Sequence, residues 1–132
     1  MSYNILFFGD SNTQNYLPNS YLETNNVKAH VENYPGLRLA EAMFDFYFTE
    51  ALKDDDYDLV ILSIGTNDIG GGMSKKQLES LYKIVKNDIY QSLIIVGPCG
   101  DINTLGLSTT DGVHFDKNAV KLIGERLIKL IE

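Results

Sequence analysis

Three short apolar runs constrain the fold of this chain more than any other feature of its sequence. They read ILFF at 5–8, LVIL at 59–62 and LIIV at 93–96. Runs of this length and composition are typical of strands buried on both faces of a sheet. Glycine or small polar residues follow each run and mark its end. We therefore expect a sheet whose central strands are covered on both sides.

The segments between these runs have the periodicity of helices. Apolar residues recur at three-and-four spacing over 40–52, which is typical of one buried helix face. Ser74 and Gln77 have the spacing of a capping box and should begin a second amphipathic helix. Asp116 is a suitable N-cap for a third, over 117–131. These patterns predict helices that pack against the sheet.

Two further segments complete the expected architecture. Residues 27–31, VKAHV, alternate apolar and polar like a half-covered edge strand, and the polar residues 12–26 form a loop that carries at most a short helix. Alternating strands and helices favour a parallel sheet with right-handed crossovers. The expected fold is α/β, a three-layer α/β/α flavodoxin-like arrangement with strand order 2-1-3-4 in chain numbering. We expect one domain over 1–132, because 132 residues with 44% hydrophobic content can bury one core.

The charge, the apolar stretches and the cysteine count limit the kinds of partner that we expect for this chain. The formal net charge is −7 and the basic residues are dispersed, so nucleic acid is not an expected partner. No apolar stretch has the length of a signal peptide or membrane span, so we expect no membrane partner and a cytoplasmic location. Cys99 is the single cysteine, which excludes an internal disulfide. Little chain follows residue 96 to cover the last strand, and that open edge predicts a homo-oligomer or attachment to a larger assembly.

Polar residues stand just beyond several of the predicted strand ends. In open parallel sheets, ligands bind outside the carboxyl ends of the strands, where the strand order reverses. Residues from distant segments are therefore expected to share one rim. They are Ser11, Gly36, Asn67, Asp68, Asp111 and His114.

These residue types fit acyl transfer. A serine hydroxyl needs a base to become a nucleophile, and a neutral imidazole is the usual base near pH 7. His114 can act as the base for Ser11, and Asp111 can fold back onto the imidazole through a turn eased by Gly112. The amides of Ser11 and Gly36 and the side chain of Asn67 are candidate donors to the oxyanion.

Other roles for these residues remain open at this point. Ser11 or Asn12 can also be read as a helix cap, and Asp68 as the acid that partners the histidine. We favour a supporting role for Asp10 and Asp68, in which each braces a loop by accepting backbone N–H bonds. Asp10, Asp111 and His114 lack a tight metal-ligand pattern, so no metal is expected.

Four blocks of the sequence resemble those of the SGNH hydrolases, also called the GDSL esterases and lipases. The blocks are GDSN from Gly9, Pro35-Gly36, GTND from Gly65 and DGVH from Asp111, in the family's order. The resemblance implies that Ser11 is the nucleophile, that Ser11, Gly36 and Asn67 form the oxyanion hole, and that Asp111 and His114 complete the triad. Asn12 replaces the leucine of the four-letter name.

The resemblance also implies a reaction and a size for the fold. The family fold usually has five strands, so this chain resembles a shortened member, and we expect its fifth strand to be reduced or missing. We expect a serine esterase that hydrolyses small or short-chain acyl esters, including O-acetyl groups on carbohydrate, through an acyl-enzyme and without a cofactor. The alternative is a non-catalytic module that binds a glycan or a protein on the same scaffold.

Overall fold

The centre of the protein is a sheet of five parallel strands. The computed structural model describes residues 2–132. The strand order is β2-β1-β3-β4-β5, which confirms the predicted order 2-1-3-4 and adds one strand. The strands are β1 (Tyr3–Gly9), β2 (Val27–Asn33), β3 (Leu59–Ser63), β4 (Ser92–Gly97) and β5 (Ile102–Asn103). The fifth strand is therefore present but has only two residues.

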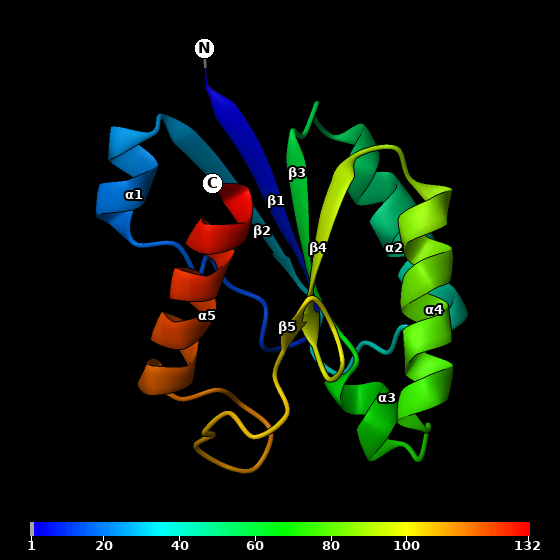
Figure 1. The fold of residues 1–132 in the computed structure, drawn as a ribbon. Helices are drawn as coiled ribbons and strands as arrows, with labels where there is room; N and C mark the ends of the chain where they lie inside the picture. Colours follow the sequence, from blue (N-terminus) through cyan, green and yellow to red (C-terminus); the bar gives the residue numbers. More distant parts are fainter. Residues whose placement is uncertain (1) are drawn as a thin grey trace.

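Helices cover both faces of this sheet, as Figure 1 shows. On one side lie α1 (Asn19–Thr24) and α5 (Lys117–Ile131). On the other lie α2 (Ala42–Lys53), α3 (Thr66–Gly70) and α4 (Lys75–Asp88). The three-layer α/β/α prediction is thus confirmed.

Strand β1 shows why its apolar run is continuous. Ile5 and Phe7 belong to the apolar cluster that includes α5, whereas Leu6 and Phe8 belong to the cluster that includes α2 and α4. All four side chains are fully buried. Successive side chains of a strand point to opposite faces, so a strand covered on both faces needs apolar residues at every position.

The predicted helix starts are confirmed by their caps. Ser74 Oγ accepts a hydrogen bond from Gln77 N at 3.1 Å, and Gln77 Oε1 accepts one from Ser74 N at 3.1 Å. Asp116 Oδ1 accepts one from Ala119 N at 2.9 Å. These bonds satisfy N–H groups that have no partner within the helix.

The structure differs from the sequence analysis in one helix. The GTND block lies at the start of α3, which no pattern predicted. A helix of five residues is too short to display an apolar stripe, so periodicity could not reveal it.

The free edge of β4 is partly covered. β5 pairs with Val96 and Gly97, and Asp101 Oδ2 accepts a hydrogen bond from Ile95 N at 2.8 Å. Lys86 Nζ lies 2.6 Å from Asp101 Oδ1 and compensates that charge. A carboxylate thus takes the place of a strand at this edge. The expected oligomer stays a prediction.

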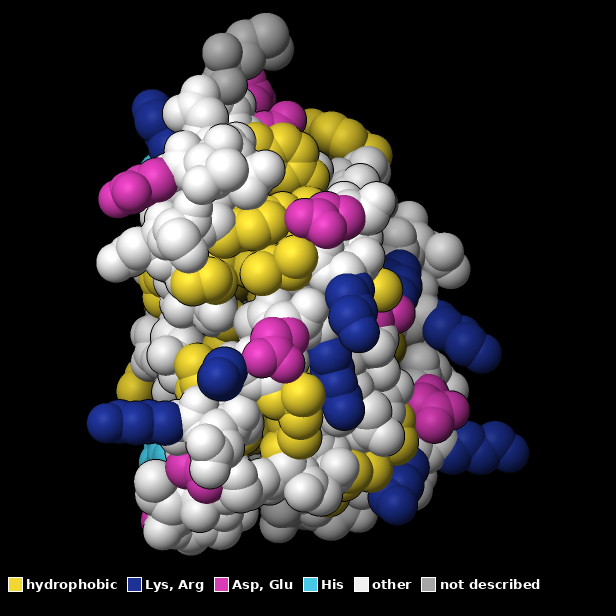
Figure 2. All heavy atoms as spheres, turned by 60° about the vertical axis from the view of Figure 1, so that its left-hand side comes forward, with side chains coloured by type: hydrophobic (Ala, Val, Ile, Leu, Met, Phe, Trp, Pro, Cys, Tyr) yellow, Lys and Arg dark blue, Asp and Glu magenta, His cyan; other side chains and the backbone are white. Residues whose placement is uncertain are grey.

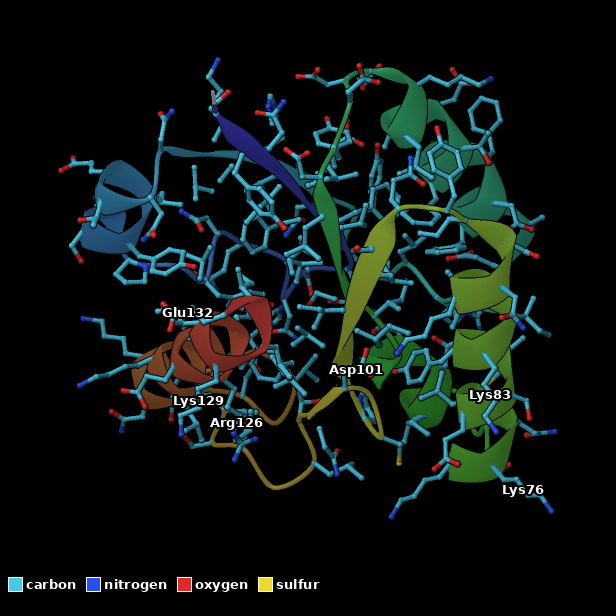
Figure 3. The ribbon with its side chains drawn as sticks, turned by 45° about the horizontal axis from the view of Figure 1, so that its top comes forward. Lys76, Lys83, Asp101, Arg126, Lys129 and Glu132 are labelled. Atoms are coloured by element: carbon cyan, nitrogen blue, oxygen red, sulfur yellow. The ribbon has the colours of Figure 1, made fainter. Side chains whose placement is uncertain are left out.

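Basic side chains are distributed over both sides of the molecule. Figure 3 shows Lys76 and Lys83 on α4 but Arg126 and Lys129 on α5, across the sheet. On the face in Figure 2, basic and acidic side chains are scattered among apolar side chains. Within residues 2–132, no helix has the length and apolar character needed to cross a membrane.

Candidate active site

The candidate site lies at the carboxyl edge of the sheet. Gly9 is in register with Asn33 of β2 and with Ser63 of β3, and Ser63 is in register with Val96 of β4. The loops that follow these strands therefore leave from one edge, the lower one in Figure 1. This is the edge at which open parallel sheets bind ligands.

The turn that carries Ser11 is held tightly against β3. Gly9 has a φ of +155°, and a Cβ at this position would overlap the carbonyl oxygen of Ser63, so only glycine fits. Asp10 N donates to Ser63 O at 3.0 Å, and Thr13 N donates to Asp10 O at 3.0 Å. The apolar strand stops at small residues because the chain must turn here, close to its neighbour.

Ser11, His114 and Asp111 form one chain of contacts. Ser11 Oγ lies 3.1 Å from His114 Nε2, although 103 residues separate them, and His114 Nδ1 lies 2.6 Å from Asp111 Oδ2. A carboxylate at Nδ1 favours the tautomer with its proton on that nitrogen. Nε2 is then free to accept the proton of the serine hydroxyl.

The carboxylate of Asp111 is stabilised by its own loop. Its Oδ1 accepts hydrogen bonds from His114 N at 2.7 Å and from Val113 N at 3.0 Å. The backbone N–H of His114, then its imidazole, then the Val113 N–H hold the pKa of this carboxyl well below its usual range. Gly112 makes the turn with a φ of +87°. The side chains of His114 and Asp111 are 49% and 52% exposed, so the site is open to solvent.

The loop that carries Gly36 is tied to the start of α3. Asn67 Nδ2 donates to Leu37 O at 3.2 Å. The two oxygens of the buried Asp68 carboxylate accept Leu39 N at 2.9 Å and Ala40 N at 3.0 Å. Asp68 is thus engaged by backbone N–H groups while Asp111 contacts the imidazole.

Three groups in the loops at this edge of the sheet can donate to a ligand oxygen. Within residues 2–132, no protein acceptor is hydrogen-bonded to the backbone N–H of Ser11 or Gly36. Asn67 Nδ2 carries two N–H groups, of which one is directed to Leu37 O. A Cβ on Gly36 would meet no neighbouring atom, so its backbone is open to a ligand.

Asp10 is a buried carboxyl directly before Ser11. Its side chain is 1% exposed, and its Oδ1 accepts Asn12 N at 2.9 Å. Burial raises the pKa of Asp10 to about 6; the Asn12 N–H opposes the shift, the charge of Asp68 adds to it, and His114 opposes it. This group therefore titrates between acidic and neutral pH.

The sequence did not predict the contacts of two asparagines at this edge of the sheet. Asn33 Nδ2 donates to Ser11 O at 3.1 Å and to Thr13 O at 3.0 Å, which fixes the serine turn from the side of β2. Asn12 reaches the loop of His114. Both lie at or just beyond a strand's carboxyl end, and that placement was the available signal. In the part of the chain that the structure describes, no group of three or more His, Cys, Asp or Glu residues could hold a metal ion.

Comparison with known proteins supports the fold. No family model and no curated protein matches this sequence. The chain is similar to the crystal structure of a carbohydrate acetylesterase family member from Sinorhizobium meliloti. That match has a TM-score of 0.65 and 16% sequence identity, and covers 98% of this chain and 97% of the other. The two chains share their fold over nearly their whole lengths.

Proposed function

We propose that this protein is a serine esterase that hydrolyses small acyl esters, with acetyl groups on carbohydrate as the substrate class. The observation that carries the proposal is the chain of contacts from Ser11 Oγ through the His114 imidazole to the Asp111 carboxylate. The likeness of the fold to a carbohydrate acetylesterase family member supports the choice of acyl group.

In the proposed acylation, each group of the site has one role. Ser11 Oγ attacks the ester carbonyl carbon while its proton passes to His114 Nε2. The Asp111 carboxylate accepts a hydrogen bond from Nδ1–H and stabilises the imidazolium that forms. The N–H groups of Ser11, Gly36 and Asn67 donate to the carbonyl oxygen as it becomes negative. The imidazolium then protonates the departing alcohol, which leaves an acyl group on Ser11.

Deacylation uses the same groups in reverse. His114 Nε2 takes a proton from water, whose oxygen attacks the acyl carbon. The tetrahedral intermediate collapses, Ser11 Oγ recovers its proton from Nε2, and the acid is released. Every proton is thus returned, and no cofactor is required.

The open surroundings of the triad favour a small acyl group. Two hollows beside α2 and α4, of about 390 Å³ and about 370 Å³, are not lined by any triad residue. A long acyl chain gains affinity mainly from a deep apolar pocket. We therefore expect turnover to fall as the acyl chain lengthens.

The test compares Ser11→Ala and His114→Gln with the wild type. Hydrolysis of 4-nitrophenyl esters from acetate to octanoate, release of acetate from acetylated sugars and labelling by a fluorophosphonate probe are measured. His30→Gln is the matched control, because His30 also lies near a carboxylate, 3.8 Å from Asp55, but is not in the Ser11 contacts. We expect both site variants to lose turnover, Ser11→Ala to lose labelling, and the control to keep both.

Two outcomes would contradict the proposal. Turnover that persists in folded Ser11→Ala would remove the nucleophile from its role. A folded wild type that neither hydrolyses the esters nor reacts with the probe would favour the non-catalytic binding module instead.

A further inference from the structure

The side chain of Asn12 links the loop of the nucleophile to the loop of the base. Asn12 Nδ2 donates to Val113 O at 3.0 Å, and Asn12 Oδ1 accepts from Phe115 N at 3.0 Å. The two bonded peptide groups lie on either side of His114. Asn12 itself follows Ser11 directly in the sequence. One buried amide, in a residue that is 5% exposed, therefore contacts the residues that flank the imidazole.

Both bonds require a carboxamide. In a parallel ladder, one residue donates its N–H to the carbonyl before a position on the neighbouring strand, and its own carbonyl accepts from the N–H after that position. The Asn12 side chain makes this pair of bonds to the residues before and after His114. A carboxylate can accept from Phe115 N but cannot donate to Val113 O, and leucine of similar size can do neither.

The backbone of Asn12 is held in place by hydrogen bonds to buried residues. Its backbone N–H donates to Asp10 Oδ1 at 2.9 Å, and its carbonyl oxygen accepts from Tyr16 Oη at 2.6 Å. Tyr16 is 4% exposed, and its Oη also lies 2.9 Å from Ser63 Oγ at the end of β3. The position of Asn12 is therefore set by the sheet.

The loop of His114 has few other polar links to the sheet. Between residues 9–17 and 108–116, the hydrogen bonds are the two of Asn12 and the contact of His114 with Ser11. The remaining bonds of the loop are internal, such as Thr110 N to His114 O at 2.9 Å, or join Asp116 to the start of α5. The loop is also largely exposed, from Asp111 to His114. Phe115 also packs against the apolar cluster that includes α5, and Asn12 supplies the side-chain amide bonds between this loop and the turn of Ser11.

We propose that Asn12 is the positioning residue that holds His114 within hydrogen-bond reach of Ser11. The catalytic consequence rests on the proposed esterase function. The structural consequence, an imidazole held over the serine hydroxyl, can be measured without turnover.

The kinetic test uses Asn12→Leu, which removes both bonds at similar side-chain volume. A displacement of the base by about 1 Å is expected to lower kcat by about 100-fold. KM should change by less than about 3-fold, because the substrate-binding donors are left in place. Asn15→Leu is the matched control, since Asn15 lies in the same loop but its side chain bonds only locally, to Leu17 N at 3.0 Å.

The spectroscopic test follows the His114 imidazole by ¹⁵N NMR. The hydrogen bond from Ser11 is read from the Nε2 shift, and Ser11→Ala gives the value without that bond. We expect Asn12→Leu to move the His114 Nε2 shift most of the way to the Ser11→Ala value, while the His30 shift stays unchanged. Amide exchange at Phe115 N should accelerate as well, because its acceptor is gone.

The outcomes separate the positioning role from the esterase function. An inactive wild type whose Nε2 shift still moves in Asn12→Leu would overturn the esterase and support the positioning role. Folded Asn12→Leu with wild-type kcat, or with a wild-type Nε2 shift, would overturn the positioning role. Should Asn12→Leu fail to fold, Asn12→Ala also removes both bonds, to Val113 O and from Phe115 N. A wild-type shift in that variant would overturn the role equally.

Discussion

Asp10→Asn should gain stability relative to the wild type as the pH rises from acid to neutral. The wild-type carboxyl is almost completely buried, and its pKa rises from 3.8 to about 6 on folding. A raised native pKa means that the folded state holds the proton more tightly than the unfolded state. The free energy of unfolding of the wild type therefore falls as the pH rises from about 4 to above 6.

The size of this loss follows from the shift. About 2 pH units at about 1.4 kcal/mol per unit correspond to about 3 kcal/mol of destabilisation above pH 7. Asparagine is neutral at every pH and has an Oδ1 that can still accept Asn12 N. The unfolding free energy of Asp10→Asn minus that of the wild type should thus increase by about 3 kcal/mol from pH 3 to pH 8. The lowered pKa of Asp111 gives an opposite pH dependence, but it is common to both proteins and cancels.

The assay is urea unfolding followed by circular dichroism at unit steps from pH 3 to pH 8. A constant offset between the proteins reports how the new NH₂ group fits, so the change of the difference with pH is the measured quantity. Asp88→Asn, at an exposed carboxylate at the end of α4, controls for removing one surface charge. A difference that is flat with pH, or that falls as pH rises, would refute the reasoning.

Two further variants probe the supports of the site. Gly9→Ala should lower the free energy of unfolding by about 3 kcal/mol, because its Cβ would overlap Ser63 O. The control is Gly70→Ala, whose Cβ meets no atom, and it should cost far less in the same urea titration. Asp68→Asn should lower the free energy of unfolding by about 1 to 3 kcal/mol, because an amide can accept only one of its two backbone N–H bonds; its rate of fluorophosphonate labelling should also fall, as Gly36 loses its fixed place.

These two predictions fail in different ways. Equal stability of Gly9→Ala and Gly70→Ala would show that β1 and β3 do not approach as closely as described. Unchanged stability of Asp68→Asn would mean that its carboxylate does not brace the Gly36 loop, and a lower stability with an unchanged labelling rate would separate that brace from the chemistry.

The elements that the sequence predicted are those with a strong local signal. The buried strands are continuous apolar runs, and the helix starts are set by a capping box at Ser74 and an N-cap at Asp116, so each could be read within a few residues. α3 and β5 could not, because five and two residues are too few for a period. Their existence depends on the packing of their neighbours.

In the candidate site, too, the sequence predicted the local contacts and not the long-range ones. The contact between Asp111 and His114 joins residues three apart, and Gly112 shows in the sequence that a turn between them is easy. The amide bonds that Asn12 and Asn33 make to other loops have no local pattern. The sequence around an asparagine beyond a strand is the same whether its side chain faces solvent or bonds to a distant backbone. The sequence therefore assigned no such contact to Asn12 or Asn33.

The sequence by itself determined the layers of this protein, their order and the residue types available at one edge of the sheet, because burial and turn chemistry are encoded locally. Only the tertiary structure decided that Ser11 and His114, 103 residues apart, lie 3.1 Å from each other. That distance depends on the parallel register of β1 with β3 and on a buried amide at Asn12. Those interactions exist only once the chain has folded, and they are what turns separate polar residues into a candidate triad.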